Sequence, residues 1–247
     1  MKITMITAVR NSADTIERTI RSVLNQNYPE LEYWIIDGCS TDGTLEIVKK
    51  YSDQIKYISE KDSGISDAFN KGISKATGDI IGIINADDMV APGTFNTIAS
   101  IYSEDIDIIY GNGIRVYKDG TQKPYNSADN PNSLYIGMSM CHPAVYVSKK
   151  AYSKYGGFSI DYKCVMDREL LLRMLHGGAK FLYVNKVFGY YTMGGMSENN
   201  YYKYTLPEDY RISVNYGMSP VAAGMHIVSQ VFLYWGSKCK QRLLKIV

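Results

Sequence analysis

Hydrophobic residues follow two alternating periods along the first 90 positions of the chain. Four short apolar runs are typical of buried strands, at residues 3–9, 33–36, 55–58 and 80–84. Between them, apolar residues recur at spacings of three and four, which predicts helices over residues 13–27, 45–51 and 65–76. Ser12 precedes the first of these helices and is its expected N-cap. The alternation predicts an α/β fold, a mostly parallel sheet with covering helices.

The second half of the chain has a more mixed pattern. Helices are predicted over residues 94–103 and 165–175, and the second of these ends at a pair of glycines. Extended segments are predicted at residues 107–116, 180–184 and 187–192, with a polar loop at 124–137. Asp119 stands in a tight turn, where turn chemistry explains it better than a functional role.

Acidic residues directly follow two of the predicted strands. Asp37 ends the second strand, and Asp87 and Asp88 end the fourth. Ligands of open parallel sheets bind outside the carboxyl ends of the strands, so these acids are expected in one crevice. A divalent cation, Mn²⁺ or Mg²⁺, would remove the repulsion between adjacent carboxylates and bind a phosphate-bearing substrate. The alternative is that Asp87 and Asp88 only open the helix at residues 94–103.

Composition narrows the class of protein. The chain has 247 residues, of which 45% are hydrophobic, and this suits a single sizeable core. A net charge of +2 gives no electrostatic case for nucleic acid, so no nucleic-acid partner is expected. The four cysteines are scattered without C-x-x-C spacing, which favours a reducing cytoplasm over a zinc site or a disulfide framework. The first residues do not read as a signal peptide.

Five segments together resemble the family 2 glycosyltransferases. They are TAVRN at 7–11, IIDGCSTDGT at 35–44, DSGISDAFNKGISKATGD at 62–79, NADD at 85–88 and VMDRELLLR at 165–173. The resemblance runs from residue 1 to about residue 200 and implies a GT-A fold. It further implies inverting, metal-dependent transfer of a sugar from a nucleotide-sugar donor, expected to be UDP-linked. The acceptor would be a hydroxyl of a glycan or of a polyprenyl-diphosphate-linked molecule, in bacterial surface-polysaccharide biosynthesis (O-antigen, capsule or exopolysaccharide).

The resemblance also implies roles for individual residues. Thr7 and Asn11 would border the nucleotide pocket, and Asp37 would bind the base. The donor side would be lined by Asp62, Asp67 and Asn70, and the metal and ribose would be held by Asp87 and Asp88. Asn85 departs from the acid that often begins the family's acidic triplet, so the choice between Asp87 and Asp88 as direct metal ligand stays open.

Asp167 matches the general base of the family. An acceptor hydroxyl that attacks the anomeric carbon must lose its proton to a carboxylate. The alternative is an acid placed in the first turn of a helix, where the dipole favours it. His142 is expected near the acceptor or in a structural role. Gly194 and Gly195 are expected in a loop that closes over the donor diphosphate, or in a simple flexible turn.

The C-terminal segment, residues 217–247, is set apart from a catalytic domain over residues 1–216. Residues 221–236 are mostly apolar, and a cluster of basic residues follows: Lys238, Lys240, Arg242 and Lys245. One interpretation is an interfacial helix on the inner face of the cytoplasmic membrane, through residues 221–247. The other is a helix packed on the domain or on a partner. The sequence does not predict an oligomeric state.

Two other functions compete with sugar transfer. A sugar nucleotidyltransferase shares the parallel sheet and the acidic metal site, but no glycine- and arginine-rich loop follows residues 3–9. A catalytically inactive scaffold of the same fold stays open because of Asn85. A dehydrogenase is disfavoured, since no G-x-G-x-x-G follows the first strand.

Overall fold

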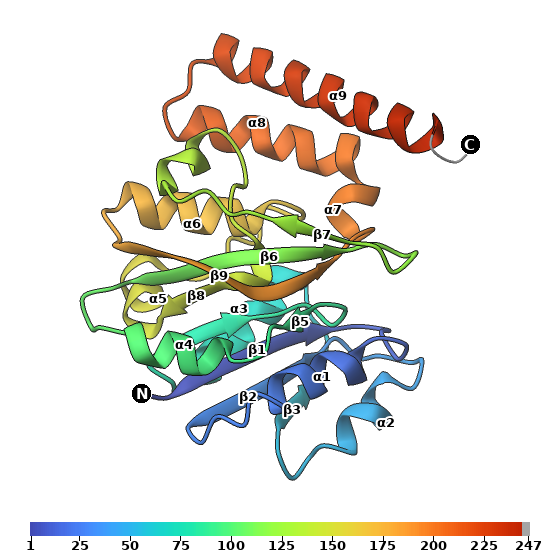
Figure 1. Cartoon of the computed structure of the whole chain (residues 1–247), viewed down its shortest axis with the longest axis vertical. Helices are drawn as coiled ribbons and strands as arrows, with labels where there is room; N and C mark the ends of the chain where they lie inside the picture. The colour runs from blue at the N-terminus through green and yellow to red at the C-terminus, as the bar shows by residue number, and fades with distance from the viewer. Residues whose placement is uncertain (244–247) are drawn as a thin grey trace.

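The computed structural model describes the backbone of residues 1–243, with all side chains among them except those of residues 196, 197, 233 and 236–243. In this part of the chain, nine strands form one sheet in the order β3-β2-β1-β4-β8-β6-β9-β5, and β7 pairs with β6 (Figure 1). None of its helices is both long and apolar enough to cross a lipid bilayer.

The N-terminal half forms the parallel part of the sheet, as predicted. Its strands are β1 (Ile3–Val9), β2 (Leu31–Asp37), β3 (Lys56–Ser59) and β4 (Ile80–Ile83). Its helices are α1 (Ile16–Leu24), α2 (Thr44–Lys49) and α3 (Ile65–Lys75). β1 lies between β2 and β4 and is parallel to both. The carboxyl ends of these three strands therefore lie at the same edge of the sheet.

The second half extends the sheet with antiparallel pairs. β8 (Val145–Ser148) lies antiparallel between β4 and β6 (Ile108–Val116), and β9 (Phe181–Thr192) runs parallel to β6. Two short strands were predicted over residues 180–192, but they form the single strand β9, which absorbs register shifts opposite Gly111 and Asn112. β9 also pairs with β5 (Met89–Val90), while β7 (Gln122–Tyr125) forms a hairpin with β6.

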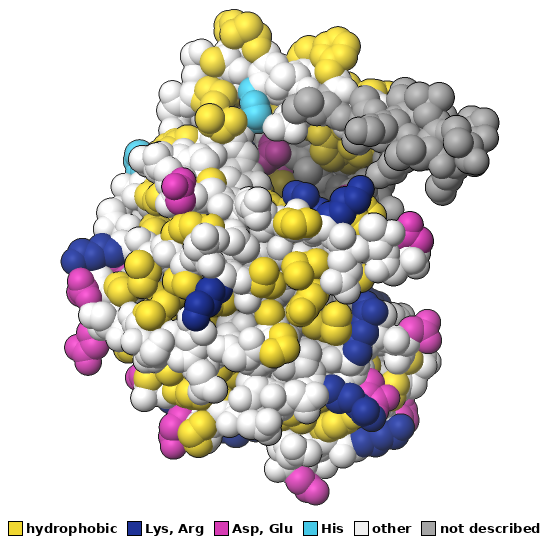
Figure 2. Space-filling model, viewed as in Figure 1, with side chains coloured by type: hydrophobic (Ala, Val, Ile, Leu, Met, Phe, Trp, Pro, Cys, Tyr) yellow, Lys and Arg dark blue, Asp and Glu magenta, His cyan; other side chains and the backbone are white. Residues whose placement is uncertain are grey.

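Helices cover the rest of the second half. They are α4 (Thr94–Ile101), η1 (Pro131–Tyr135), η2 (His142–Ala144), α5 (Lys149–Tyr155), α6 (Met166–His176), α7 (Met196–Asn199), the π-helix η3 (Tyr201–Thr205), α8 (Leu206–Asn215) and α9 (Pro220–Leu243). The predicted loop at residues 124–137 therefore contains η1 and the end of β7. α8 and α9 stack at the end of the molecule remote from β2 and β3 (Figure 1). Hydrophobic side chains gather on the surface there (Figure 2).

Helix starts in the first half differ in detail from the prediction. Ser12 does not cap α1, because the helix begins at Ile16 and the position before it is Thr15. The Ser12 carbonyl instead accepts hydrogen bonds from the backbone of Thr15 and Ile16, in a turn that precedes the helix. At the start of α2, the Asp42 Oδ1 accepts the Thr44 backbone N–H at 3.1 Å.

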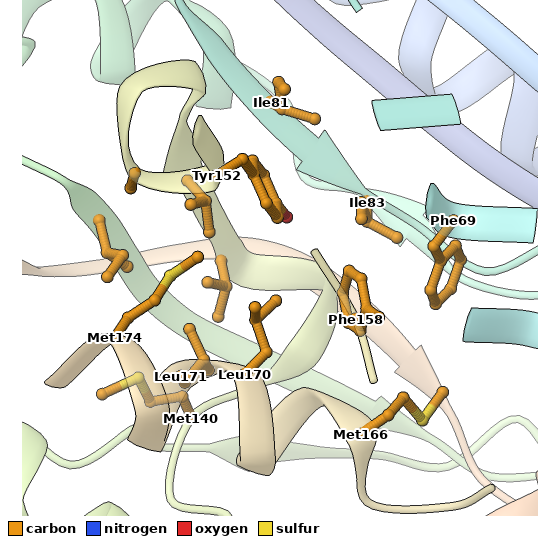
Figure 3. Packing of buried hydrophobic residues seen from close by; sticks show 14 of the residues in the cluster. Phe69, Ile81, Ile83, Met140, Tyr152, Phe158, Met166, Leu170, Leu171 and Met174 are labelled. Carbon is orange, nitrogen blue, oxygen red and sulfur yellow. The ribbon is translucent and has the colours of Figure 1, made fainter. Parts of the chain in front are cut away.

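The hydrophobic core has two parts, one on each face of the sheet. One part joins α3 and α6, and Figure 3 shows Phe158 between Phe69 and Leu170 within it. The Phe69 and Phe158 ring centroids are 5.1 Å apart. The other part packs α1 and α4 through residues such as Ile20 and Phe95, both fully buried. Each such side chain contributes roughly 1.5–3 kcal/mol relative to exposure.

Two buried charged residues tie elements together. Glu32 in β2 accepts hydrogen bonds from Thr4 in β1, from Lys56 in β3 and from Thr77 in the turn before β4. Burial by itself would raise the pKa of Glu32, but the Thr77 N–H, Lys56 and Thr4 outweigh it and lower that pKa to about 2. Glu32 and its hydrogen-bond partners lie at the amino ends of the parallel strands.

Arg168 is the second buried charge, and it is fully buried in α6. Its guanidinium donates to the Leu134 and Tyr135 carbonyls of η1. It also pairs with Asp209 of α8 at 2.8 Å. Arg168 thereby fixes α6, η1 and α8 to one another.

Candidate active site

A cleft of about 680 Å³ opens at the carboxyl ends of the parallel strands. One wall comes from the loops that follow β1, β2, β3 and β4, and the other from η2, the start of α6 and the end of β9. This is the edge at which open α/β sheets bind their ligands. Strands from both halves of the chain therefore build the cleft together.

The loops after β1 and β2 are held in shape by Asn11. Its Oδ1 accepts the Thr41 backbone N–H at 2.9 Å, and its own N–H donates to the Ser40 hydroxyl. Asn11 has a positive φ of 51°, a conformation that asparagine adopts more readily than most residues. Gly38 allows Asp62 to approach the end of β2, because a Cβ at this glycine would collide with the Asp62 carboxylate.

The corner that follows β4 separates two neighbouring acids. Asp88 is almost fully buried, and its carboxylate accepts the Thr192 N–H at 2.7 Å and the Asn85 side-chain N–H at 3.2 Å. Burial, together with the neighbouring Asp87 charge, raises the pKa of Asp88 well above its ordinary value. Asp87 instead lines the cleft. Its backbone carbonyl is held by Arg18 and Thr192, which leaves the carboxylate for a ligand.

Asn85 and Asp87 offer oxygen atoms suited to a divalent cation. The Asn85 Oδ1 is buried and has no hydrogen-bond partner in the described part of the chain. The Asp87 carboxylate is desolvated, and burial raises its pKa. Carboxylate and amide oxygens bind Mg²⁺ and Mn²⁺, which commonly take further ligands from substrate phosphates and water. Among the described residues, no group of three or more His, Cys, Asp and Glu side chains is placed to hold a metal.

Asp167 and His142 meet on the other wall of the cleft. The Asp167 Oδ2 lies 3.6 Å from the His142 Nδ1, and both side chains remain partly exposed. Asp167 stands in the first turn of α6, where the helix dipole favours a carboxylate, and its Oδ1 accepts the Arg168 N–H. His142 stacks on Phe69, with ring centroids 6.0 Å apart. Burial lowers the pKa of His142, although Asp167 acts in the opposite direction.

Basic side chains also reach the cleft, and the sequence interpretation had not singled them out. Arg10 and Lys163 line it, and Arg18 bonds to the Asp87 carbonyl at 2.8 Å. Arg10 stands within the TAVRN segment, so its place after a strand was a usable signal. Lys163 carries no such signal, because its position depends on packing before α6. These cations suit an anionic ligand.

The structure brings half of the predicted site residues to the cleft. Those that line it are Asn11, Asp62, Asp87, His142, Asp167 and Gly195. Asp37 does not, because its fully buried carboxylate accepts hydrogen bonds from Ser40 and Ser59. Thr7 is also fully buried and shares a hydrogen bond with the Tyr33 hydroxyl.

Asp67, Asn70, Asp88 and Gly194 likewise lie outside the cleft lining. Asp67 accepts the Ser63 N–H at the start of α3, and this bond and the nearby Lys71 lower its pKa despite slight desolvation. Asn70 exchanges two hydrogen bonds with the Phe158 backbone, each of 2.8 Å. Both contacts hold α3 in place.

Comparison with known proteins identifies the family. The model of the glycosyl transferase family 2 matches residues 4–163. The chain belongs to this family. This glycosyltransferase is 30% identical to Bacillus subtilis EpsE over 188 residues, covering 72% of this chain and 68% of that protein. It is 25% identical to Escherichia coli chondroitin synthase over 184 residues, covering 72% of this chain and 27% of that enzyme. The chain thus spans only part of these relatives.

Solved structures confirm the GT-A fold of this glycosyltransferase. S. aureus TarS, residues 1–349 in complex with UDP-GlcNAc, matches with a TM-score of 0.72 and 18% identity, covering 92% of this chain and 70% of that one. The mannosyltransferase PcManGT of Pyrobaculum calidifontis, in complex with GDP-Man and Mn²⁺, matches with a TM-score of 0.67 and 17% identity. That match covers 94% of this chain and 69% of the mannosyltransferase.

Proposed function

We propose that this family 2 enzyme is an inverting glycosyltransferase that moves a sugar from a UDP-linked donor to an acceptor hydroxyl, with Asp167 as the general base. The observation that carries the proposal is the presence of Asp87 and Asp167 in one cleft, on walls built by different halves of the chain. The reaction needs one acidic group that binds the metal ion at the donor diphosphate. It needs a second that takes the proton of the acceptor hydroxyl.

Asp167 acts on the acceptor. As the hydroxyl oxygen bonds to the anomeric carbon, the bond from that carbon to the diphosphate oxygen breaks, and Asp167 takes the hydroxyl proton. His142 lies beside the base, with its Nδ1 3.6 Å from the Asp167 Oδ2, and burial lowers the pKa of its ring. Asp167 stands in the first turn of α6, where the helix dipole stabilises a negative charge.

Asp87 and Asn85 act on the donor. They would hold a Mn²⁺ or Mg²⁺ ion, which stabilises negative charge on a departing diphosphate. Arg10 and Lys163 add positive charge on the cleft walls for the same group. Asp88 stabilises the corner after β4, because its carboxylate accepts hydrogen bonds from the Thr192 N–H and the Asn85 side chain. We therefore assign direct metal contact to Asp87 rather than Asp88.

The UDP donor and a role in surface-polysaccharide synthesis extend the same proposal. They are supported by the fold shared with a structure that contains UDP-GlcNAc and by the likeness to a chondroitin synthase. The acceptor would be a growing glycan or a polyprenyl-diphosphate-linked molecule. Synthesis on the cytoplasmic side of the membrane suits both the nucleotide-sugar donor and such an acceptor.

Thermal shift with a panel of nucleotide sugars and Mn²⁺ tests the donor, because a ligand of the native state raises the melting temperature. A UDP-sugar should raise it only when Mn²⁺ is present. Asp87→Asn should abolish that shift. The outcome that contradicts the donor assignment is a GDP-sugar or a dTDP-sugar giving the larger shift.

Hydrolysis of the identified donor then tests the base, since water takes the place of the acceptor. Asp167→Asn should keep the donor-induced thermal shift and lower kcat roughly 10²- to 10⁴-fold. Asp119→Asn is the matched control, because Asp119 is exposed in a turn and does not line the cleft. Wild-type kcat in Asp167→Asn would remove the base assignment.

A further inference from the structure

The outward side of α9 carries a continuous row of large apolar side chains. Val221, Met225, Val228, Phe232 and Trp235 are each between 55% and 73% exposed. Their spacing of four, three, four and three places them on one side of the helix, over about 21 Å. Figure 2 shows hydrophobic side chains gathered over this end of the molecule. We call these five residues the α9 stripe.

The opposite side of α9 is packed on the protein, so the stripe is not a sign of a loose helix. Ala223 is fully buried. The Tyr234 ring stacks on Tyr201 of η3, with centroids 4.4 Å apart and planes 14° apart. The Tyr201 hydroxyl donates to the Gln230 carbonyl. The helix is therefore docked by its inner side, and its outer side has no cover among the described residues.

The sequence around the stripe has only positive charge. No Asp or Glu follows Asp209, whereas Lys238, Lys240, Arg242 and Lys245 come directly after the stripe. The aromatic residues Phe232 and Trp235 stand at the end of the stripe next to these cations. Aromatic and basic residues side by side are typical of helices that lie in the headgroup region of an anionic bilayer.

We propose that the α9 stripe docks this enzyme onto an anionic lipid surface. A second copy of the chain fits less well, because paired helices carry opposite charges at the positions flanking the apolar row. Here those positions are Ala222, Gly224, Ser229 and Val231, none of which is charged. Anionic lipid headgroups, in contrast, complement the basic residues, and each lysine or arginine near such a surface adds to binding.

The docking helix is also connected to the cleft. Lys163 lines the cleft, and its Nζ lies 4.8 Å from the centre of the Tyr204 ring in η3. The same π-helix carries Tyr201, which stacks on Tyr234 of α9. One short helix thus touches both a wall of the cleft and the docking helix. If the proposed transfer reaction holds, this arrangement presents that wall to a lipid-anchored acceptor; the docking itself does not depend on that reaction.

Flotation of the full-length chain with vesicles tests the docking without any sugar transfer. Two vesicles are compared, one of phosphatidylcholine and one that also contains about 30% phosphatidylglycerol as the anionic lipid. The stripe variant is Phe232→Ser with Trp235→Ser, and the charge variant is K238Q, K240Q, R242Q and K245Q. Ile160→Ser is the matched control, because Ile160 is equally exposed but lies outside α9. Circular dichroism and melting temperature check that each variant is folded.

Wild type and Ile160→Ser should float with the anionic vesicles and much less with phosphatidylcholine alone. The stripe variant and the charge variant should each bind the anionic vesicles about tenfold more weakly. Failure of wild type to float with either vesicle would overturn the proposal, as would equal flotation of the stripe variant. A lipid-free dimer that the stripe variant dissociates, with no vesicle binding by wild type, would assign the stripe to a second copy instead.

Discussion

Asp87 and Asp88 are adjacent in sequence but have different chemical surroundings. Asp88 uses its carboxylate to hold the Thr192 N–H and the Asn85 amide, whereas Asp87 has its carboxylate in the cleft. An aspartate at position 85 would put a further charge beside the buried Asp88. Asn85 instead donates a hydrogen bond to Asp88 and keeps its own oxygen free. Asn85 therefore donates a hydrogen bond to the buried Asp88 and adds no negative charge beside Asp87 and Asp88.

This difference predicts opposite effects of two alanine substitutions. Asp88→Ala should lower the free energy of unfolding by roughly 1–3 kcal/mol, because the part-buried N–H of Thr192 loses its acceptor. Asp87→Ala should leave that free energy within about 0.5 kcal/mol of wild type, yet abolish the metal-dependent thermal shift by the donor. Urea unfolding and thermal shift measure the two quantities. A stability loss confined to Asp87→Ala would contradict the division of roles.

The burial of His142 predicts that the free energy of unfolding depends on pH. Burial lowers its pKa below the ordinary value of 6.5, although Asp167 opposes this, so the unfolded chain binds the proton more readily than the folded one. The folded state should therefore lose stability as pH falls below about 6.5. His142→Asn should weaken that loss, as measured by urea unfolding at pH 7 and pH 5. His176→Asn, outside the cleft, is the control, and a matching change in both variants would contradict the prediction.

At the scale of elements, Glu32 joins three parallel strands and a turn at the edge opposite the cleft. Its pKa of about 2 lies below the ordinary value of 4.5, so its stabilising contribution is fully present above about pH 4.5 and disappears as pH falls toward 2. Glu32→Gln should lower the unfolding free energy at pH 7 by roughly 2–3 kcal/mol and cost much less at pH 3. Glu30→Gln, on the same side of the sheet but exposed, serves as the control.

Arg168 joins helices rather than strands, and it pairs its fully buried guanidinium with the Asp209 carboxylate, whose side chain is 18% exposed. Removing one partner of a buried ion pair leaves the other charge without compensation, which typically costs 3–5 kcal/mol. Arg168→Met should therefore destabilise strongly, and adding Asp209→Asn should recover part of the loss. Urea unfolding of the two single variants and the double variant measures the coupling. Purely additive losses would show that the pair does not hold α6 to α8.

For the whole molecule, the sequence predicted the parallel half well, because each of its strand–helix units is local. The insertion of β8 between β4 and β6 was not predictable from spacing, since it joins residues more than 60 positions apart. The residues that line the cleft were likewise only partly predictable from the sequence. Strand ends predicted that Asp87 lies at the cleft, but no periodicity reveals that Asp37 is buried and bonded to the hydroxyls of Ser40 and Ser59. Lys163 was missed because tertiary packing brings it to the cleft, and Arg18 because packing brings it to the Asp87 carbonyl.

The hydrogen bond between Thr192 and Asp88 spans 104 residues, and this separation has a consequence for synthesis. A ribosome adds roughly 5–20 residues per second, so Asp88 emerges about 5–20 s before its partner. Through that interval β1 to β4 can pair, and Arg18 and Thr19 can bond to the Asp87 and Asp88 carbonyls, but the Asp88 carboxylate lacks the Thr192 N–H. The parallel part of the sheet can therefore form before the corner that carries Asp87 is complete.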